Sequence, residues 1–159
     1  MTSGVPYTST NSGSTTAPMN MPQTGMAYSP AMADLAVGDT TTSAYVANGS
    51  FWYMLWDFLV PTTVTKHEIT VTDSVNGLNI YGSNDGYTWV AVPSGGGGGF
   101  VAQISYTYPT PPTYRYMQFV TPHHVTDWRF WDNAGVLIAS IPPPVVANNV
   151  VTRIARLRR

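Results

Sequence analysis

The sequence predicts an all-β fold, a jelly roll or β-sandwich of about eight short antiparallel strands with an extended arm at each end. Two apolar runs within residues 78–92 are separated by Asn84-Asp85-Gly86. Turn signals separate the expected strands at intervals of roughly 8 to 12 residues. No stretch of the central region shows the apolar period of a long amphipathic helix.

The hairpin at residues 78–92 is the strongest local signal. Asp-Gly between apolar runs indicates a tight turn, because such a turn needs positive φ and Gly86 supplies it without steric cost. Ile80 and Gly82 share one face of the first strand, and Trp89 and Val92 supply bulk after the turn. We therefore expect two antiparallel strands here.

The remaining strands are expected from alternation and from aromatic content. The first, at residues 51–58, is rich enough in aromatic side chains to be buried on both faces. The second, at residues 67–73, places His67 and Ile69 on one face. Further strands are expected at residues 100–106, 114–120, 127–130 and 135–141, and alternation in 114–120 places Arg115, Met117 and Phe119 on one face.

Several motifs resemble those of discoidin-type domains, also known as coagulation-factor type C or galactose-binding-like domains. The hairpin sequence IYGSNDGYTW is similar to the central hairpin of that family. GDTTTSAY resembles its first motif, with Gly38 and Asp39 exchanged and Tyr45 in place of Trp. WYMLWDF, YRYMQF and VTDWRFWD follow in the family's order. The resemblance spans residues 33–140 and implies a β-sandwich in which Asp57 accepts structural hydrogen bonds.

The composition is poor in charge. Only 9% of residues are charged, against about 25% in ordinary soluble proteins. Either partners cover much of the surface, or hydroxyl and amide groups solvate it, and both interpretations stay open. Without cysteine, the chain offers no disulfide, thiolate nucleophile or cysteine-bound metal.

Residues 1–32 are expected to form an uncharged N-terminal arm, and residues 33–144 the β domain. The arm is too poor in apolar bulk to fold alone, so it would be disordered or would become ordered on a partner subunit. Its candidate anchors are apolar and adaptable: Tyr7, Met19, Met21, Met26, Tyr28 and Met32.

Residues 145–159 are expected to form a basic C-terminal arm. One or two turns of helix would place Ile154 and Leu157 on an apolar edge. Four of the seven basic residues lie here, namely Arg153, Arg156, Arg158 and Arg159. They could dock on an acidic protein groove or on phosphates, or only keep the tail in solution.

No catalytic, metal or cofactor motif is found. His123 and His124 are adjacent, so on a strand they point to opposite faces and cannot easily hold one ion. The glycine run at residues 95–99 lacks the Lys-Ser/Thr of a phosphate-binding loop. The N-terminus lacks the pattern of a secretory signal, and the longest apolar run is too short to cross a bilayer. We expect a non-enzymatic protein without cofactor or membrane contact.

Exposed aromatic side chains are the better functional lead. Five tryptophans and ten tyrosines exceed the need of one small core, and their flat faces suit sugar or protein recognition. Discoidin-type domains bind ligands with loops at one end of the barrel. The resemblance therefore nominates loops that contain Tyr45, Asn48, Gly97, Pro111 and Pro112.

We expect a bacteriophage virion structural protein, either a capsid cement or decoration protein or a tail or fibre component. In that role the terminal arms would lock neighbouring virion subunits together, including further copies of this chain. The alternative is a carbohydrate-binding module that recognises host-surface glycans through exposed aromatic side chains. Nucleic-acid binding through the C-terminal arginines is a weaker third expectation.

Overall fold

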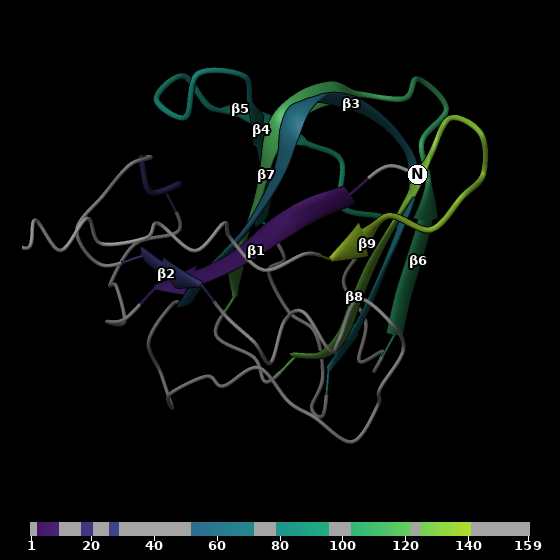
Figure 1. Ribbon diagram of the computed structural model, residues 1–159. Coiled ribbons are helices and arrows are strands. Elements are labelled where there is room, and N and C mark those ends of the chain that lie inside the picture. Colours follow the sequence, from purple (N-terminus) through teal and green to yellow (C-terminus); the bar gives the residue numbers. More distant parts are fainter. Residues whose placement is uncertain are drawn as a thin grey trace, which may run out of the picture.

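A computed structural model describes residues 3–9, 17–20, 26–28, 52–71, 79–95, 103–121 and 125–140. Nine strands are found in this part of the chain, and no helix (Figure 1). They are β1 (Ser3–Ser9), β2 (Met26–Tyr28), β3 (Trp52–Val71), β4 (Asn79–Ser83), β5 (Val90–Val92), β6 (Gln103–Thr107), β7 (Thr113–Thr121), β8 (Val125–Asp132) and β9 (Ala139–Ser140). The predicted all-β class is confirmed.

β3 belongs to both layers of the sandwich and bends from one into the other (Figure 1). Its first half lies in a layer ordered β2-β1-β3-β7-β4-β5, and its second half pairs with β6 and β8. The expectation of two separate strands is wrong, because residues 59–66 continue the strand. The pairing with β7 shifts register between Asp57 and Thr62, and Leu59 adopts a φ of 68°. This bulge redirects the strand.

The hairpin β4–β5 forms as the sequence predicts. Ile80 pairs with Val92, and Gly86 takes a φ of 79° in the turn. The Asp85 carboxylate accepts hydrogen bonds from the backbone N–H groups of Tyr87 and Thr88, at 2.8 and 2.7 Å. These bonds favour the charged carboxylate and hold the pKa of Asp85 well below its usual range.

One hydrophobic core fills the space between the layers. Trp56 from the first layer contacts Phe130 from the second with ring centroids 5.7 Å apart. The buried core residues from both layers are Met54, Trp56, Phe58, Val64, Ile69, Ile80, Val92, Ile104, Tyr108, Met117, Phe119, Trp128, Phe130 and Ile138. The alternation predicted for β7 is confirmed, since Met117 and Phe119 face this core.

Part of the segment expected as an N-terminal arm lies in the sheet. β1 pairs with β2 and β3 in antiparallel orientation and with β9 in parallel orientation. Val5 is fully buried, and Gly4 lies so close to the Trp56 indole that a side chain there would overlap it. The Gln118 side-chain amide also exchanges hydrogen bonds with the backbone N–H and carbonyl of Met19. The first layer therefore binds its own N-terminal residues.

Candidate functional site

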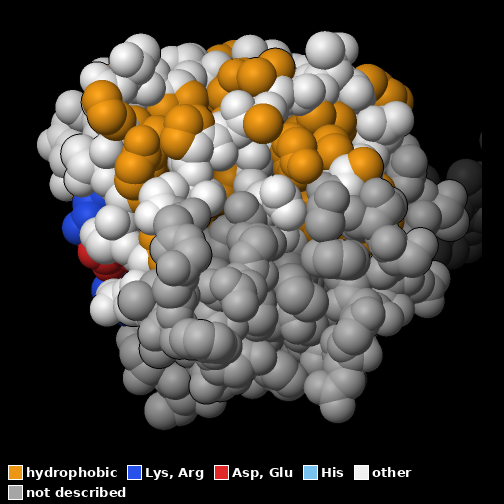
Figure 2. Space-filling model, turned by 180° about the vertical axis from the view of Figure 1, so that it is seen from behind, with side chains coloured by type: hydrophobic (Ala, Val, Ile, Leu, Met, Phe, Trp, Pro, Cys, Tyr) orange, Lys and Arg blue, Asp and Glu red, His pale blue; other side chains and the backbone are white. Residues whose placement is uncertain are grey.

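The large hydrophobic side chains that are exposed in the described part of the chain lie at one end of the sandwich. Leu59 and Val60 belong to the β3 bulge, Tyr87 and Val90 to the β4–β5 hairpin, and Val136 to the turn after β8. The pairing of β3 with β7 and of β7 with β4 places the bulge near the hairpin turn. Figure 2 shows hydrophobic side chains gathered on the described part of one face, with charged side chains at its edge.

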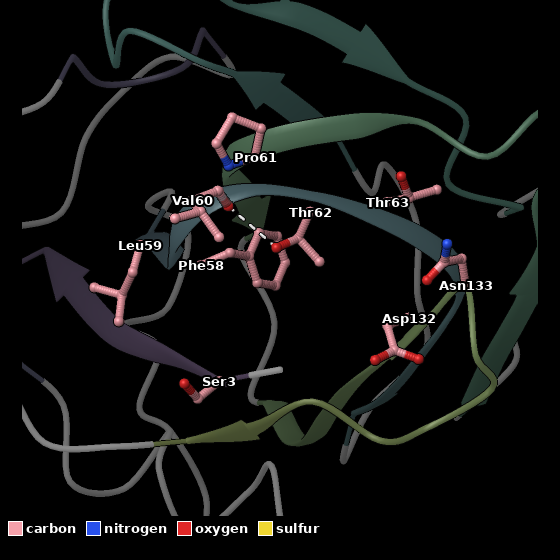
Figure 3. Close-up of a pocket in the computed structure, with 9 residues that line it drawn as sticks. All are labelled: Ser3, Phe58, Leu59, Val60, Pro61, Thr62, Thr63, Asp132 and Asn133. Atoms are coloured by element: carbon pink, nitrogen blue, oxygen red, sulfur yellow. Dashed lines mark hydrogen bonds between the residues drawn. The ribbon is translucent and has the colours of Figure 1, made fainter. Parts of the chain in front are cut away.

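The larger of two depressions at this end lies between β1, the β3 bulge and the turn after β8. Its volume is about 550 Å³. It is lined by Ser3, Phe58, Leu59, Val60, Pro61, Thr62, Thr63, Asp132 and Asn133. Figure 3 shows Leu59 and Ser3 on one side of the opening and Asp132 and Asn133 on the other. The walls thus combine aliphatic groups with hydroxyl, amide and carboxylate groups.

Asp132 shapes the polar wall of this depression. Its Oδ1 accepts hydrogen bonds from the backbone N–H groups of Ala134 and Val136, at 2.9 and 3.0 Å. The turn is completed by the Asp132 N–H, which donates to the Val136 carbonyl at 3.0 Å. Asn133 consequently stands at an exposed position on a turn that its neighbour fixes.

The aliphatic wall is held by an ion pair behind it. Arg115 donates from Nε and Nη2 to the two carboxylate oxygens of Asp57, at 3.0 and 3.1 Å. Asp57 Oδ1 also accepts the Leu59 N–H at 2.7 Å, and the Arg115 N–H donates to Asn84 Oδ1 at 2.9 Å. The hydrogen bond to Asp57 raises the pKa of Arg115. The structural role that the resemblance implied for Asp57 fits this geometry.

The smaller depression lies beside the hairpin. Its volume is about 220 Å³, and Asn84, Asp85, Thr88, Val90 and Tyr114 line it. Tyr114 lies directly against the bare backbone of Gly82, because a Cβ at that glycine would fall 2.1 Å from the ring. Thr62 of the larger depression pairs with Tyr114 across β3 and β7, so the two depressions are neighbours.

The structure describes only two of the five residues that were predicted to lie in ligand loops. Pro111 is exposed and Pro112 half-buried in the connection between β6 and β7, at the same end as the depressions. Neither proline lines a depression. The other nominated loop residues, Tyr45, Asn48 and Gly97, lie outside the described residues.

The structure also describes only some of the residues that were predicted to anchor the arms on a partner. Tyr7 is half-buried in β1, Met19 is half-buried beside Gln118, and Met26 and Tyr28 form the ends of β2. Residues of both arms lie outside the described part of the chain: Met21, Met32, Arg153, Ile154, Arg156, Leu157, Arg158 and Arg159. Their role as partner anchors stays a prediction.

Tryptophan is less exposed than the sequence suggested. Trp56 and Trp128 are buried in the core. Trp131 is half-buried, with the Lys66 ammonium 4.6 Å from its ring centroid. These rings therefore serve packing. Among the described residues the exposed large aromatic side chain is Tyr87, which lies in the hairpin turn and lines neither depression. Sequence reasoning missed the residues of the larger depression, although Pro61, just after the aromatic run at residues 51–58, was a usable signal of irregular backbone.

The structure gives no support for a metal centre. Within residues 3–140 as far as they are described, no three His, Cys, Asp or Glu side chains cluster to hold an ion. His67 is fully buried, and Tyr108 Oη and the Ser94 carbonyl occupy its ring nitrogens at 2.8 and 3.1 Å. His123 and His124 lie outside the described residues. The described part of the chain contains no helix that is long and apolar enough to cross a membrane.

The architecture defines the class of the domain. Two layers joined by a strand common to both, with a central hairpin and an aromatic core, form a β-sandwich. No protein-family model matches the chain, and a search of curated proteins finds no match to its sequence. The assignment to this fold therefore comes from the structure.

Solved carbohydrate-binding modules share this fold. A module designated CpGH89CBM32-6, produced by Clostridium perfringens, superposes with a TM-score of 0.56 at 16% identity, over 62% of this chain and 82% of the module. Chitosan-binding module 2 of a chitosanase/glucanase from Paenibacillus sp. IK-5, solved with chitotriose, gives 0.53 at 16% identity over 77% and 93%. The CBM32 of AlyQ, solved with 4,5-unsaturated mannuronic acid, gives 0.50 at 21% identity over 72% and 96%.

Proposed function

We propose that the protein is a carbohydrate-binding domain and that the larger depression holds the glycan. The observation that carries the proposal is the composition of the walls. Leu59, Val60 and Pro61 offer an aliphatic side with the Ser3 hydroxyl beside it, while Asn133 offers a polar group across the opening. A sugar ring presents C–H groups on its faces and hydroxyl groups at its edge, so such walls complement it.

Two further observations support this proposal. The volume of about 550 Å³ lies within the roughly 300 to 1,000 Å³ typical of small-molecule sites. The bulge that forms the aliphatic wall is fixed by Asp57 and Arg115, so its backbone is organised before a ligand arrives. The solved modules of the same fold include complexes with chitotriose and with 4,5-unsaturated mannuronic acid.

The proposal is tested by screening the full chain against an array of oligosaccharides and measuring the hits by calorimetry. We expect saturable binding of at least one glycan. Val60→Ser, which removes apolar contact at a side chain 61% exposed, should weaken that binding roughly fivefold. Asn133→Ala should weaken it similarly by removing a polar partner.

Val90→Ser provides the matched control. Val90 is 50% exposed and lines only the smaller depression, so the substitution has the same chemistry at a different place. The Val90→Ser variant should bind the glycan with the same affinity as the unmodified protein. The absence of saturable binding to any glycan would overturn the proposal, and equal losses in Val60→Ser and Val90→Ser would move the site away from the larger depression.

An assembly role in a virion, through the terminal arms, is the second proposal. The low charge of the chain supports it, and so does the exposed apolar rim formed by Leu59, Val60, Tyr87, Val90 and Val136. Deleting residues 10–32 keeps β1 in place and removes the rest of the arm. This variant should lose self-assembly or binding to virion subunits while the sandwich stays folded, and unchanged assembly would contradict the role.

A further inference from the structure

Leu59 adopts a backbone conformation that is unfavourable for its residue type. Its φ is 68°, and no other non-glycine residue in the described part of the chain has a positive φ. In this left-handed region the Cβ of an L-residue comes too close to the following carbonyl oxygen, a clash that glycine avoids and asparagine tolerates. A leucine at this position therefore lowers the stability of the fold compared with a residue that fits the conformation.

The hydrogen bonds of the bulge impose this conformation. The Leu59 N–H donates to Asp57 Oδ1 at 2.7 Å, and Arg115 holds that carboxylate with two hydrogen bonds. One residue further on, the Thr62 hydroxyl donates to the Val60 carbonyl at 3.1 Å. None of these bonds uses the Leu59 side chain, so each of them could form with another residue at position 59. The bulge explains the positive φ, but it does not explain why the residue is a leucine.

Packing in the core does not account for the leucine either. Leu59 is 42% exposed, whereas the preceding residue, Phe58, is buried in the hydrophobic core. The Leu59 side chain lies at the opening of the larger depression, on the same side as Ser3 (Figure 3). An apolar side chain in this position gains hydrophobic stabilisation only when another molecule covers it. Leu59 thus combines an unfavourable backbone conformation with an uncovered apolar surface.

From the strain at Leu59 and its exposure at the opening, we infer that this leucine serves ligand contact: its side chain covers the apolar C–H face of a bound sugar ring. This inference rests on the proposed function and adds the residue that makes the main apolar contact, at a cost to the stability of the fold. Strained backbone is common where a ligand is bound. Because Asp57 fixes the bulge, the side chain is in position before the sugar arrives.

Thermal unfolding of two variants at each of two neighbouring positions tests the strain. Leu59→Ala and Leu59→Gly both remove the side chain, but only glycine relieves the strain, so Leu59→Gly should melt roughly 2 to 4 °C higher than Leu59→Ala. The order should reverse at position 60, where φ is not positive. Val60→Gly should melt below Val60→Ala, because glycine loses more conformational freedom on folding. The same order at both positions would overturn the inference.

Calorimetry on the full chain tests the contact with the sugar. The probes are chitotriose, cellotriose, mannotriose and galactotriose, together with the hits of the array, and the tightest binder is used for the variants. Leu59→Ala and Leu59→Gly should weaken its binding about fivefold or more and make the heat capacity change of binding less negative, because less apolar surface is buried. Leu59→Met, which keeps an apolar side chain of similar volume, should recover most of the affinity. Val90→Ala, at an exposed side chain outside the larger depression, is the matched control and should change neither quantity.

The outcomes distinguish the inference from the proposed function. Unchanged glycan affinity in Leu59→Ala would overturn the inference, and a loss in Val60→Ser would show that the glycan site remains. Impaired self-association of Leu59→Ala with unchanged glycan affinity would also overturn it, because the side chain would then serve a protein contact. Binding of none of the four trisaccharides, together with no hit on the array, would overturn the proposed function and the inference with it.

Discussion

Arg115 donates two parallel hydrogen bonds to the Asp57 carboxylate, which also accepts a hydrogen bond from the backbone N–H of Leu59. Residues that are 58 positions apart thereby fix the bulge that forms one wall of the larger depression. The Asp57 side chain is only 10% exposed, so its charge needs this partner. The pair connects the stability of the sandwich with the shape of its candidate site.

Removing one partner of this pair should destabilise the protein and loosen the bulge. We expect Arg115→Ala to lower the free energy of unfolding by about 1 to 3 kcal/mol, because it leaves the Asp57 carboxylate largely buried with fewer donors. Arg115→Lys should recover only part of this loss, since a lysine cannot make the bidentate contact. Urea denaturation measures both, and a variant as stable as the parent would contradict the assigned role.

The buried imidazole of His67 should make stability depend on pH. A carbonyl can only accept, so Nε2 donates to Ser94 and Nδ1 accepts from the Tyr108 hydroxyl, which requires a neutral ring. Burial lowers the pKa of His67 from 6.5 to about 4. The unfolded state therefore binds more protons than the folded state between these values, and stability falls as pH decreases through that window.

The expected loss attributable to His67 is about 3 kcal/mol between pH 6.5 and about 4, with no further loss below the folded-state pKa. His67→Gln can keep both hydrogen bonds without titrating, so its stability should change less over the same window. Denaturation curves at a series of pH values give the comparison. Parallel pH dependences of the parent and the variant would contradict the account.

Gly82 is required by the packing of Tyr114. A methyl group at position 82 would fall 2.1 Å from the ring, so Gly82→Ala must displace Tyr114 from the wall of the smaller depression. We expect a loss of about 1 to 3 kcal/mol from overpacking. Gly135→Ala is the control, because Gly135 has a φ of 72° with no atom within 4 Å of the added carbon. It should cost only the left-handed strain of about 1 to 2 kcal/mol, and its Tyr114 resonances should be unchanged in NMR spectra.

Gln118 should hold residue 19 on the first layer of the sandwich. Its amide makes two hydrogen bonds with the backbone of Met19, and its side chain is fully buried. Gln118→Leu keeps the apolar part of the side chain and removes both bonds. Hydrogen exchange at the Met19 amide should become faster while exchange in β3 and β7 stays slow, whereas unchanged protection at Met19 would show that the contact does not hold this segment.

The sequence was sufficient to predict the hairpin and the core-facing alternation of β7. Both depend on local chemistry: Gly86 supplies positive φ, and Met117 and Phe119 repeat with the period of a strand. The continuity of β3 could not be predicted from residues 59–66, because strand pairing with β6 and β8 overrides the turn signal of Pro61. Long-range pairing leaves no local pattern.

The candidate site was largely beyond sequence reasoning for the same reason. Ser3, Leu59 and Asn133 come from three distant segments and meet only because β1 and β8 flank the bend of β3. Aromatic content pointed instead to the tryptophans, and Trp56 and Trp128 proved to be core residues. The loops nominated by Tyr45, Asn48 and Gly97 stay predictions.

The most direct measurement is an NMR titration of the isotopically labelled full chain with the best glycan from the array. Amide shifts detect weak binding and locate it on the sequence in one experiment. Binding in the larger depression predicts saturable shifts at residues 58–63 and 132–133, with smaller changes at the buried β7 residues Met117 and Phe119. Saturable shifts confined to other segments, or no saturable shifts with any glycan, would contradict the proposed site and function.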